Sequence, residues 1–414
     1  MIGGAGSEAE MIAPVPRISI QAFCETQEVA QIVQKAVGDR RMEKAHVKVH
    51  MGGATAAVEA YRSAPTPNII VLETSGDRSE LISSLESLAE YCDAGTKVVV
   101  TGRLNDIVLY RELMARGISD YLVVPFEVLD FIRTISALYT HIDAEPLGKI
   151  IAVTGVKGGV GASVVAHNIG FSIARDLQLQ TVIADMDLGF GTVGLDFNQD
   201  PPQGIAEAVF APDRLDANLV DRLLSRCTDR LSILAAPATL DRVYDFSDTA
   251  FDHLIDILRT STPYVILDVP HVWSAWARRM LVGADEIVVV ATPELASLRN
   301  AKSIVDTLRL ARPHDGAPHL VLNQVGVPKR PEISIADFSK AVDLKPVCSI
   351  PFEPKLFGTA ANNGQMIAEV EAASKVAEMI SDLARIVTGK HEIRRPSKNI
   401  LKPFMDRLSR KKAS

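Results

Sequence analysis

A glycine-rich stretch, Gly155-Val156-Lys157-Gly158-Gly159-Val160-Gly161-Ala162-Ser163, carries the residue types that bind phosphate groups. Glycines let the backbone curl until several N–H groups point at one anion, and a helix that starts next adds a favourable dipole. The apolar run 150–153 predicts a strand before the loop, and 163–177 predicts a helix after it. Ser163, at the helix start, can offer its hydroxyl to a magnesium ion on the phosphates. The alternative is a glycine turn that only connects strand to helix.

The loop has the spacing of a P-loop from Gly155 to Gly161, but its lysine is displaced. A standard P-loop ends in Gly-Lys-Ser/Thr, and that lysine contacts the β- and γ-phosphates. Here the position is Ala162, and a lysine stands earlier, at Lys157. Because charge stabilisation is the main catalytic contribution in phosphoryl transfer, the missing lysine should slow hydrolysis of a bound nucleotide.

Two further motifs place carboxylates at the ends of apolar strands. Asp185 and Asp187 close the run 181–184 two residues apart, so both side chains should leave the strand on one face. Asp268 closes the run 264–267, which is the Walker B arrangement that holds magnesium through water. A turn with solvated acids is the alternative for the Asp185 and Asp187 pair.

Three more strand ends are predicted to lie beside the glycine loop and the aspartates. Asn323 ends the apolar run 320–322, and its amide can both donate and accept hydrogen bonds. A simple strand-end cap is the alternative role for this residue. The segments 291–294 and 349–354 end two other strands. These segments should lie at the C-terminal edge of a parallel sheet, where open α/β sheets bind ligands.

Five of these segments resemble the ParA/MinD ATPases, whose deviant P-loop has an early lysine followed by Gly-Gly. In chain order they are the glycine loop, 181–191, 264–271, 320–324 and 349–354. The resemblance implies ATP and Mg²⁺ as cofactors and an ATP-dependent homodimer, in which Lys157 reaches across to the partner's nucleotide. We expect nucleotide binding with slow or partner-stimulated hydrolysis. The residues that the resemblance assigns to nucleotide binding are Lys157, Gly158, Gly159, Val160, Gly161, Ala162, Ser163, Asn323, Pro351 and Phe352.

The same resemblance gives individual roles to the polar residues. Asp187 positions the attacking water, and Lys157 assists from the partner subunit. Ser163, Asp185 and Asp268 hold the magnesium ion or its water shell. Asn323 reads the adenine base, flanked by the backbone of 349–354.

Length and periodicity predict two α/β domains with terminal extensions. From 17 to 143 strands alternate with helices five times, which implies a doubly wound parallel sheet. We expect a disordered N-terminus (1–16), a receiver-like domain (17–143), a linker (144–149), an ATPase domain with a mainly parallel sheet (150–388) and a basic tail (389–414).

The first domain resembles a two-component receiver of flavodoxin-like fold, most closely over 118–126. It lacks the acidic pair after the first strand, Glu73 stands at the phospho-acceptor position, and Val124 replaces the lysine before Pro-Phe. Because a magnesium-dependent phosphoryl acceptor needs clustered carboxylates, we expect a degenerate domain used for docking or dimerisation. The alternatives are a permanently charged Glu73 that mimics the acceptor, and a phosphorelay output protein.

A receiver-like front, a P-loop without its lysine and the run 352–364 together resemble the CpaE/TadZ family of Flp/Tad type IVb pilus assembly. The resemblance implies a cytoplasmic localisation and assembly factor, often at a cell pole and peripheral to the inner membrane. Its implied partners are the pilus secretion ATPase and other Tad components. The competing prediction is a DNA-partition or cell-division-site ATPase of the ParA/MinD type.

Charge and cysteine content narrow these choices. Residues 389–414 contain nine basic and two acidic residues, a net charge of +7. Since the whole chain carries −7, the other 388 residues carry −14. An acidic body argues against a protein that coats nucleic acid. Apolar residues at helical spacing in 400–412 make the tail a candidate membrane-contact helix, and a disordered or docking tail is the alternative. Four widely spaced cysteines fit reduced thiols.

Overall fold

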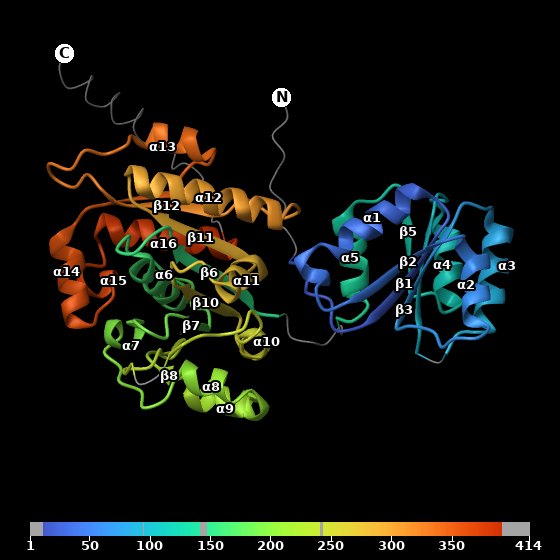
Figure 1. Cartoon of the computed structure of the whole chain (residues 1–414), viewed down its shortest axis with the longest axis horizontal. Coiled ribbons are helices and arrows are strands. Elements are labelled where there is room, and N and C mark those ends of the chain that lie inside the picture. Colours follow the sequence, from blue (N-terminus) through green and yellow to red (C-terminus); the bar gives the residue numbers. More distant parts are fainter. Residues whose placement is uncertain (1–10, 94, 141–146, 241–242, 391–414) are drawn as a thin grey trace, which may run out of the picture.

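A computed structural model describes residues 11–93, 95–140, 147–240 and 243–390 of the chain (Figure 1). These residues form two α/β units, each built on its own sheet. The predicted limit at 143 follows the last helix of the first unit, in the stretch 141–146 that lies outside the described residues, and the limit at 149 is the first residue of the strand Lys149–Gly155.

The N-terminal unit is a five-stranded parallel sheet in the order β2-β1-β3-β4-β5, which confirms the predicted doubly wound fold. Its strands are β1 (Ser19–Cys24), β2 (His46–Met51), β3 (Ile69–Thr74), β4 (Lys97–Gly102) and β5 (Asp120–Val123). Its helices are α1 (Gln27–Val37), the 3₁₀ turn Arg40–Met42, α2 (Gly53–Tyr61), α3 (Arg78–Ala89), α4 (Ile107–Ala115) and α5 (Val128–Ala137). Two apolar clusters, one with α1 and α5 and one with α2, α3 and α4, make up its core.

The segment 11–16 is ordered against this unit, so the expectation of disorder over 1–16 is wrong for these six residues. Val15 is fully buried in the cluster beneath α1 and α5. Its N–H donates to the carbonyl of Arg41 at 2.8 Å, and the Ser136 hydroxyl donates to the carbonyl of Ala13. One apolar side chain with a place in the core outweighs the Gly/Ala-rich composition of its surroundings. Residues 1–10 lie outside the described residues.

The C-terminal unit is an eight-stranded sheet in the order β13-β12-β11-β6-β10-β7-β9-β8, parallel except for the short β8. Its strands are β6 (Lys149–Gly155), β7 (Thr181–Asp185), β8 (Ser225–Arg226), β9 (Leu231–Leu234), β10 (Tyr264–Val269), β11 (Glu286–Ala291), β12 (His319–Val325) and β13 (Cys348–Pro351). The central strands are continuous apolar runs, as expected where helices cover both faces of a parallel sheet.

Helices flank this sheet on both sides (Figure 1). They are α6 (Ala162–Asp176), α7 (Val193–Asp196), α8 (Ile205–Phe210), the 3₁₀ turn Pro212–Arg214, α9 (Ala217–Leu223), α10 (Asp252–Ser261), α11 (Ala275–Gly283), α12 (Leu295–Ala311), α13 (Ile335–Val342), α14 (Pro354–Asn363), α15 (Ile367–Val370) and α16 (Lys375–Thr388). The helix after the glycine loop, α6, packs on β6, β7 and β10 and against α16. It is therefore held at the centre of the unit.

Strand register brings the predicted motifs to one edge. In the central strand β10, Asp268 pairs with Val153 of β6 on one side and with Asp185 of β7 on the other. The glycine loop begins where β6 ends, and Asn323 lies near the end of β12, two strands away. The C-terminal edge of the sheet therefore gathers the phosphate loop and both strand-end aspartates, as the alternation of strands and helices predicted.

The two units meet through a dense set of arginines and aspartates. Arg40 contacts Asp315 at 2.9 Å and Asp285 at 3.4 Å, and Arg41 pairs with Asp315. Arg312 also pairs with Asp315, at 3.1 Å. The side chains of Arg40 and Asp285 are only 8% and 5% exposed, so these charges depend on one another for solvation. The contact fixes the receiver-like unit to the start of β11.

No helix among the described residues is long and apolar enough to cross a bilayer.

All four cysteines are free thiols, as the spacing predicted; Cys24 and Cys348 are buried, and Cys92 and Cys227 are half-buried. Burial raises the pKa of Cys24 to about 12 and that of Cys348 to about 11, so both remain thiols at neutral pH.

The interface predicts an acid-dependent loss of stability centred on Asp315. Burial by itself raises the pKa of this carboxyl group, but the hydrogen bond from Arg40 and the charges of Arg312 and Arg41 lower it to about 2. A depressed folded-state pKa stabilises the protein above the unfolded value of about 4, and that stabilisation is lost as the pH falls toward about 2. Asp315→Asn should lower the urea midpoint near neutral pH.

The same variant should flatten the fall of the urea midpoint between about pH 5 and about pH 2. Asp343→Asn is the matched control, because Asp343 also pairs with an arginine but its side chain is 82% exposed. Parallel pH profiles for Asp315→Asn and the wild type would contradict the role given to Asp315.

Candidate nucleotide-binding site

The loop between β6 and α6 has the backbone shape that an anion requires. Gly159 and Gly161 have φ angles of 77° and 83°, in the left-handed region that glycine tolerates best. Gly161 is the N-cap of α6 and supplies no side-chain hydrogen bond, so the first N–H groups of the helix lack a capping side chain. A Cβ at Gly159 would meet open space, which leaves the loop accessible from outside. The loop can therefore bind an anion at the helix N-terminus.

Lys157 does not lie over its own glycine loop. Its Nζ pairs with Glu294 Oε1 at 2.8 Å, in the segment that follows β11, and the side chain is 37% exposed. The Lys157 hydrogen bond lowers the pKa of the Glu294 carboxyl, which therefore stays ionised at neutral pH. Ala162, at the standard lysine position, places a methyl group there. Within this chain the phosphate loop therefore receives no lysine charge from either position.

Beneath the loop, a histidine joins the two strand-end aspartates. His167 lies one helical turn after Ser163 on α6, so both side chains leave the helix on one face. One ligand atom from each of His167, Asp185 and Asp268 lies within 4.8 Å of the others, and all three residues are buried. The His167 Nε2 is 3.3 Å from Asp268 Oδ2, and its Nδ1 is 2.7 Å from Asp196 Oδ2.

The pKa values of His167 and Asp185 are both raised, but by different causes. Burial lowers the pKa of His167, but its contacts with Asp196 and Asp268 raise it to about 10, so the ring is an imidazolium at neutral pH. Burial and the neighbouring charge of Asp268 raise the pKa of Asp185. A cation between carboxylates offsets part of their repulsion in a dry environment.

The two aspartates of the Asp-x-Asp motif have different surroundings. Asp185 is fully buried and accepts hydrogen bonds from the N–H groups of Asp187 and Val193, both at 3.1 Å. Asp187 is half-buried and accepts from the N–H of Phe190 at 3.1 Å, so it caps the loop that follows β7. A Cβ at Gly191 would overlap the Asp185 carboxylate. Gly191 therefore allows the loop to fold closely over Asp185.

Asn323 is bound to the phosphate loop itself. Its Nδ2 donates to the carbonyl of Val160 at 2.9 Å, and its Oδ1 accepts from the N–H of Gln324. The Gln324 side chain donates to the carbonyl of Gly159 at 2.9 Å. Pro351 ends the neighbouring strand β13, and the N–H of Phe352 donates to the carbonyl of Val325. These residues form the side of the site next to β12.

The residues present fit a magnesium nucleotide. The loop offers open backbone donors at a helix start, which suits a phosphate chain. Ser163 Oγ and the carboxylates of Asp185 and Asp268 are the oxygen ligands that Mg²⁺ prefers. The His167 Nε2 is buried without a hydrogen-bond partner, as expected where a water molecule or a small shift of the Asp268 carboxylate completes a site.

Comparisons with known proteins divide the chain in the same way. No protein-family profile matches it. The crystal structure of a pilus assembly protein CpaE from Caulobacter crescentus is 48% identical over 100% of that chain, with a TM-score of 0.31; it covers 32% of this chain, in the N-terminal part. The septum site-determining protein MinD of Synechocystis is 27% identical over 253 residues, which are 59% of this chain and 91% of that protein.

The chain is a CpaE-like member of the ParA/MinD ATPase family. MinD from Pyrococcus horikoshii, solved with Mg-ADP, is 20% identical with a TM-score of 0.51; it covers 58% of this chain and 96% of that one. This likeness concerns the fold of the ATPase unit. The predicted family and fold class are confirmed. The roles of single residues stay predictions.

Most of the residues predicted for the site are brought together. The glycine loop, Ser163, Asp185 and Asp268 meet at the C-terminal edge, and Asn323 contacts the loop. His167 was missed, because one histidine in an apolar helix gives no pattern. Its position four residues after Ser163 was the available signal, since that spacing aims both side chains at the same strand ends. Glu294 was noted only as the end of a strand.

The C-terminal edge of the first sheet offers no comparable cluster. The buried Glu73 accepts hydrogen bonds from the N–H groups of Glu25 and Thr26 and from the Thr26 hydroxyl, at 2.6–2.9 Å. Among the residues that the structure describes, the group of three His, Cys, Asp or Glu near enough to share a metal is the one around His167. The carboxylate of Glu73 instead holds the start of α1.

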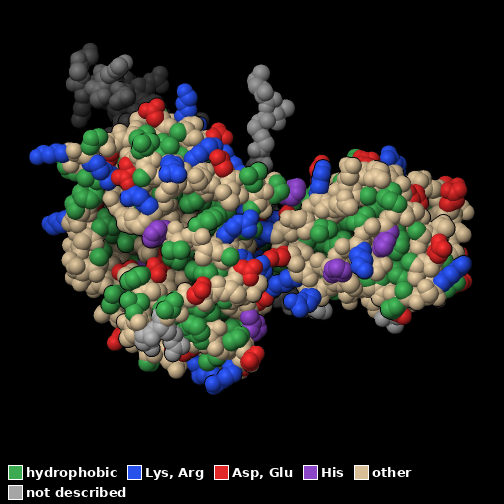
Figure 2. Space-filling model, in the orientation of Figure 1, with side chains coloured by type: hydrophobic (Ala, Val, Ile, Leu, Met, Phe, Trp, Pro, Cys, Tyr) green, Lys and Arg blue, Asp and Glu red, His purple; other side chains and the backbone are tan. Residues whose placement is uncertain are grey.

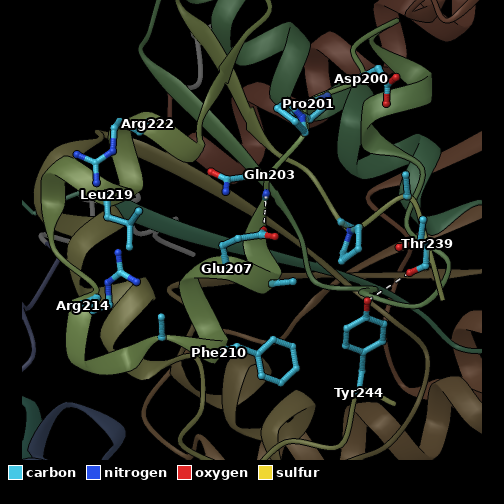
Figure 3. A pocket seen from close by; sticks show the side chains of 17 residues that line it. Asp200, Pro201, Gln203, Glu207, Phe210, Arg214, Leu219, Arg222, Thr239 and Tyr244 are labelled. Carbon is cyan, nitrogen blue, oxygen red and sulfur yellow. Dashed lines mark hydrogen bonds between the residues drawn. The ribbon is translucent and has the colours of Figure 1, made fainter. Parts of the chain in front are cut away.

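A separate pocket of about 640 Å³ lies beside α8 and α9 (Figure 3). Arg214 and Arg222 lie on one side of it, and Phe210 and Tyr244 on another. The Tyr244 hydroxyl donates to the carbonyl of Thr239. None of the lining residues belongs to the phosphate loop or to the aspartate motifs, so this pocket is distinct from the nucleotide site.

Two glycines of the loop predict different costs for the same substitution. Gly159→Ala should cost about 1–2 kcal/mol of stability, because alanine must adopt a left-handed backbone in open space. Gly161→Ala adds a contact of 2.5 Å between its Cβ and the Asn323 Nδ2, so it should cost more and break the Asn323 bond to Val160. Urea unfolding measures both costs.

Binding of a fluorescent ATP analogue should weaken more in Gly161→Ala than in Gly159→Ala. Gly283→Ala is the control, since a Cβ there meets nothing within 4 Å and the backbone is not left-handed. Equal effects of the two loop substitutions on stability and binding would contradict the role given to Asn323.

Proposed function

We propose that the chain is an ATP- and Mg²⁺-binding, dimerising localisation and assembly factor for an Flp/Tad type IVb pilus. It recruits secretion components to a site in the cell, and its ATP hydrolysis is slow or partner-stimulated. The observation that carries this proposal is the 48% identity to a CpaE pilus assembly protein in the N-terminal part, joined to a ParA/MinD unit whose phosphate loop keeps its glycines and Ser163 at the start of α6.

When bound, Mg²⁺ would neutralise phosphate charge, and residues of this chain would hold the nucleotide around it. The N–H groups from Gly158 to Ser163 bind the phosphates, and the Ser163 hydroxyl contacts the metal. Asp185 and Asp268 orient its water shell. Asp187 orients the attacking water in this proposal. Because Ala162 supplies no charge, turnover is slow and the nucleotide acts mainly as a switch.

A second copy of the chain is the partner that the edge of the site favours. Large apolar side chains follow the ends of β7, β10 and β11, the strands on either side of β6 and its loop: Phe190 is 77% exposed, Trp273 49% and Leu295 74%. Such a group of exposed apolar side chains at one edge is typical of an interaction surface. Lys157 lies at the same edge, where its Nζ pairs with Glu294 at 2.8 Å and its side chain is 37% exposed. In the dimer it leaves Glu294 and contacts the partner's nucleotide.

A cell-division-site or DNA-partition ATPase is the second candidate function, favoured by the match to MinD proteins over 91% of their length in one case. The receiver-like unit and the acidic body oppose it. On the face shown in Figure 2, Lys and Arg side chains are interspersed with Asp and Glu. Salt-dependent DNA binding would need a basic surface. The proposed membrane contact through 400–412 falls on residues outside those described.

Light scattering after gel filtration tests the dimer. The wild type should be monomeric without nucleotide and dimeric with ATP and Mg²⁺. Lys157→Ala should bind a fluorescent ATP analogue as a monomer but should form at least about tenfold less dimer, because a desolvated charge contact is worth more than 1 kcal/mol. Lys302→Ala is the matched control, since Lys302 is similarly exposed at 40% and pairs within α12.

An ATP-dependent dimer of unchanged strength in Lys157→Ala would rule out the contact across the interface. Absence of any nucleotide binding by the wild type would rule out the proposed switch as a whole. Complementation connects the dimer to assembly. In a strain that lacks this protein and its pili, Lys302→Ala should restore pili and Lys157→Ala should not.

A further inference from the structure

The buried histidine behind the phosphate loop has two carboxylate neighbours on two different structural elements. His167 is 0% exposed, and its ring lies between Asp268 at the end of β10 and Asp196 at the end of α7. The Nδ1 contact is a short hydrogen bond of 2.7 Å. The Nε2 lies 3.3 Å from Asp268 Oδ2 without hydrogen-bond geometry.

The hydrogen-bond partner of the His167 Nδ1 is Asp196, in the segment 187–196 that follows Asp185. Asp196 closes α7, which begins two residues after Gly191, and the Thr192 hydroxyl also donates to Asp196 at 3.3 Å. Asp185 holds the other end of this segment through the N–H groups of Asp187 and Val193. The segment 187–196 is thus attached both to Asp185 and, through His167, to the neighbourhood of Asp268.

We propose that His167 is a positioning residue of the magnesium site: its Nε2 orients the Asp268 carboxylate, and its Nδ1 connects that carboxylate through Asp196 to the segment 187–196. The proposal rests on the proposed function, because it assigns a role in nucleotide-dependent switching. Metal bound through Asp268 is then sensed by the loop that carries Asp187. In this arrangement the histidine acts through Asp268 and touches neither nucleotide nor metal.

The contact between Nε2 and Asp268 is the one that metal binding would complete, by turning the Asp268 carboxylate toward the ring. A buried polar atom without a hydrogen-bond partner is rare in folded proteins. Groups that hydrogen-bond to metal-orienting carboxylates fix their rotation, and losing them typically lowers metal affinity 10–100-fold. His167 is placed to do this from the rigid helix α6, which packs on three strands.

Amide substitutions separate the two ring nitrogens. In His167→Gln the amide nitrogen replaces Nε2 and retains the contact with Asp268. In His167→Asn it replaces Nδ1 and retains the contact with Asp196. His167→Ala removes both contacts. Ser172→Ala is the control for folding, because Ser172 is also buried on α6 but bonds to Asp176 within the helix.

The first measurement is the affinity for a fluorescent ATP analogue with magnesium and with EDTA. Wild type and Ser172→Ala should bind more tightly with magnesium. In His167→Asn and His167→Ala the affinity measured with magnesium should fall about tenfold, and the affinity measured in EDTA should be unchanged. His167→Gln should retain the magnesium effect.

The second measurement is amide hydrogen exchange in 187–196. Magnesium and ATP should slow exchange there in the wild type and in Ser172→Ala. In His167→Gln the metal still binds but the connection to Asp196 is broken, so the protection should be lost. A purely structural histidine would instead weaken thermal stability and both affinities together in all three variants.

The outcomes separate this inference from the proposed function. If the wild type binds no ATP analogue, the proposed function fails. If the wild type shows a magnesium effect and His167→Asn keeps it in full, the positioning role is overturned. The role is also overturned if His167→Gln loses the magnesium effect as completely as His167→Ala, or if it retains full protection of 187–196.

Discussion

The structure depends on two carboxylates held side by side at the ends of adjacent, fully covered strands. Register pairs Asp185 with Asp268, and both are almost completely removed from water. Two buried negative charges repel each other unless cations offset them. Within the chain the offset comes from His167, and a magnesium ion is the natural further cation. The C-terminal edge of the sheet is therefore a site that favours a divalent metal because of its own electrostatics.

This constraint also explains the loop around the aspartates. Gly191 lies where any side chain would strike the Asp185 carboxylate, and two backbone N–H groups of the same segment point at it. The segment is stable in this shape only while Asp185 accepts those bonds. A change in the charge around Asp185 therefore changes how firmly the segment is held, which is the property that a nucleotide-dependent switch needs.

The sequence predicted the fold and the phosphate site more completely than it predicted the supporting contacts. Apolar periodicity located every strand of the first sheet, and the glycine spacing located the loop, since both depend on local properties. His167 and Glu294 could not be found in this way, because their partners are distant in the chain and meet only through sheet register. Val15 was missed for a similar reason: its place in the core is made by α1 and α5.

The interface between the units has a consequence for assembly. Arg40 of the first unit reaches Asp285, whose carboxylate also accepts from Arg259 and from the N–H of Ile150 at the start of β6. All of these groups lie at the N-terminal ends of β6 and β11, opposite the edge that carries the phosphate loop. The receiver-like unit is therefore held by desolvated charge at the far side of the sheet (Figure 1). Trp273, which is 49% exposed, lies at the opposite edge, so the proposed dimer would not require the two units to separate.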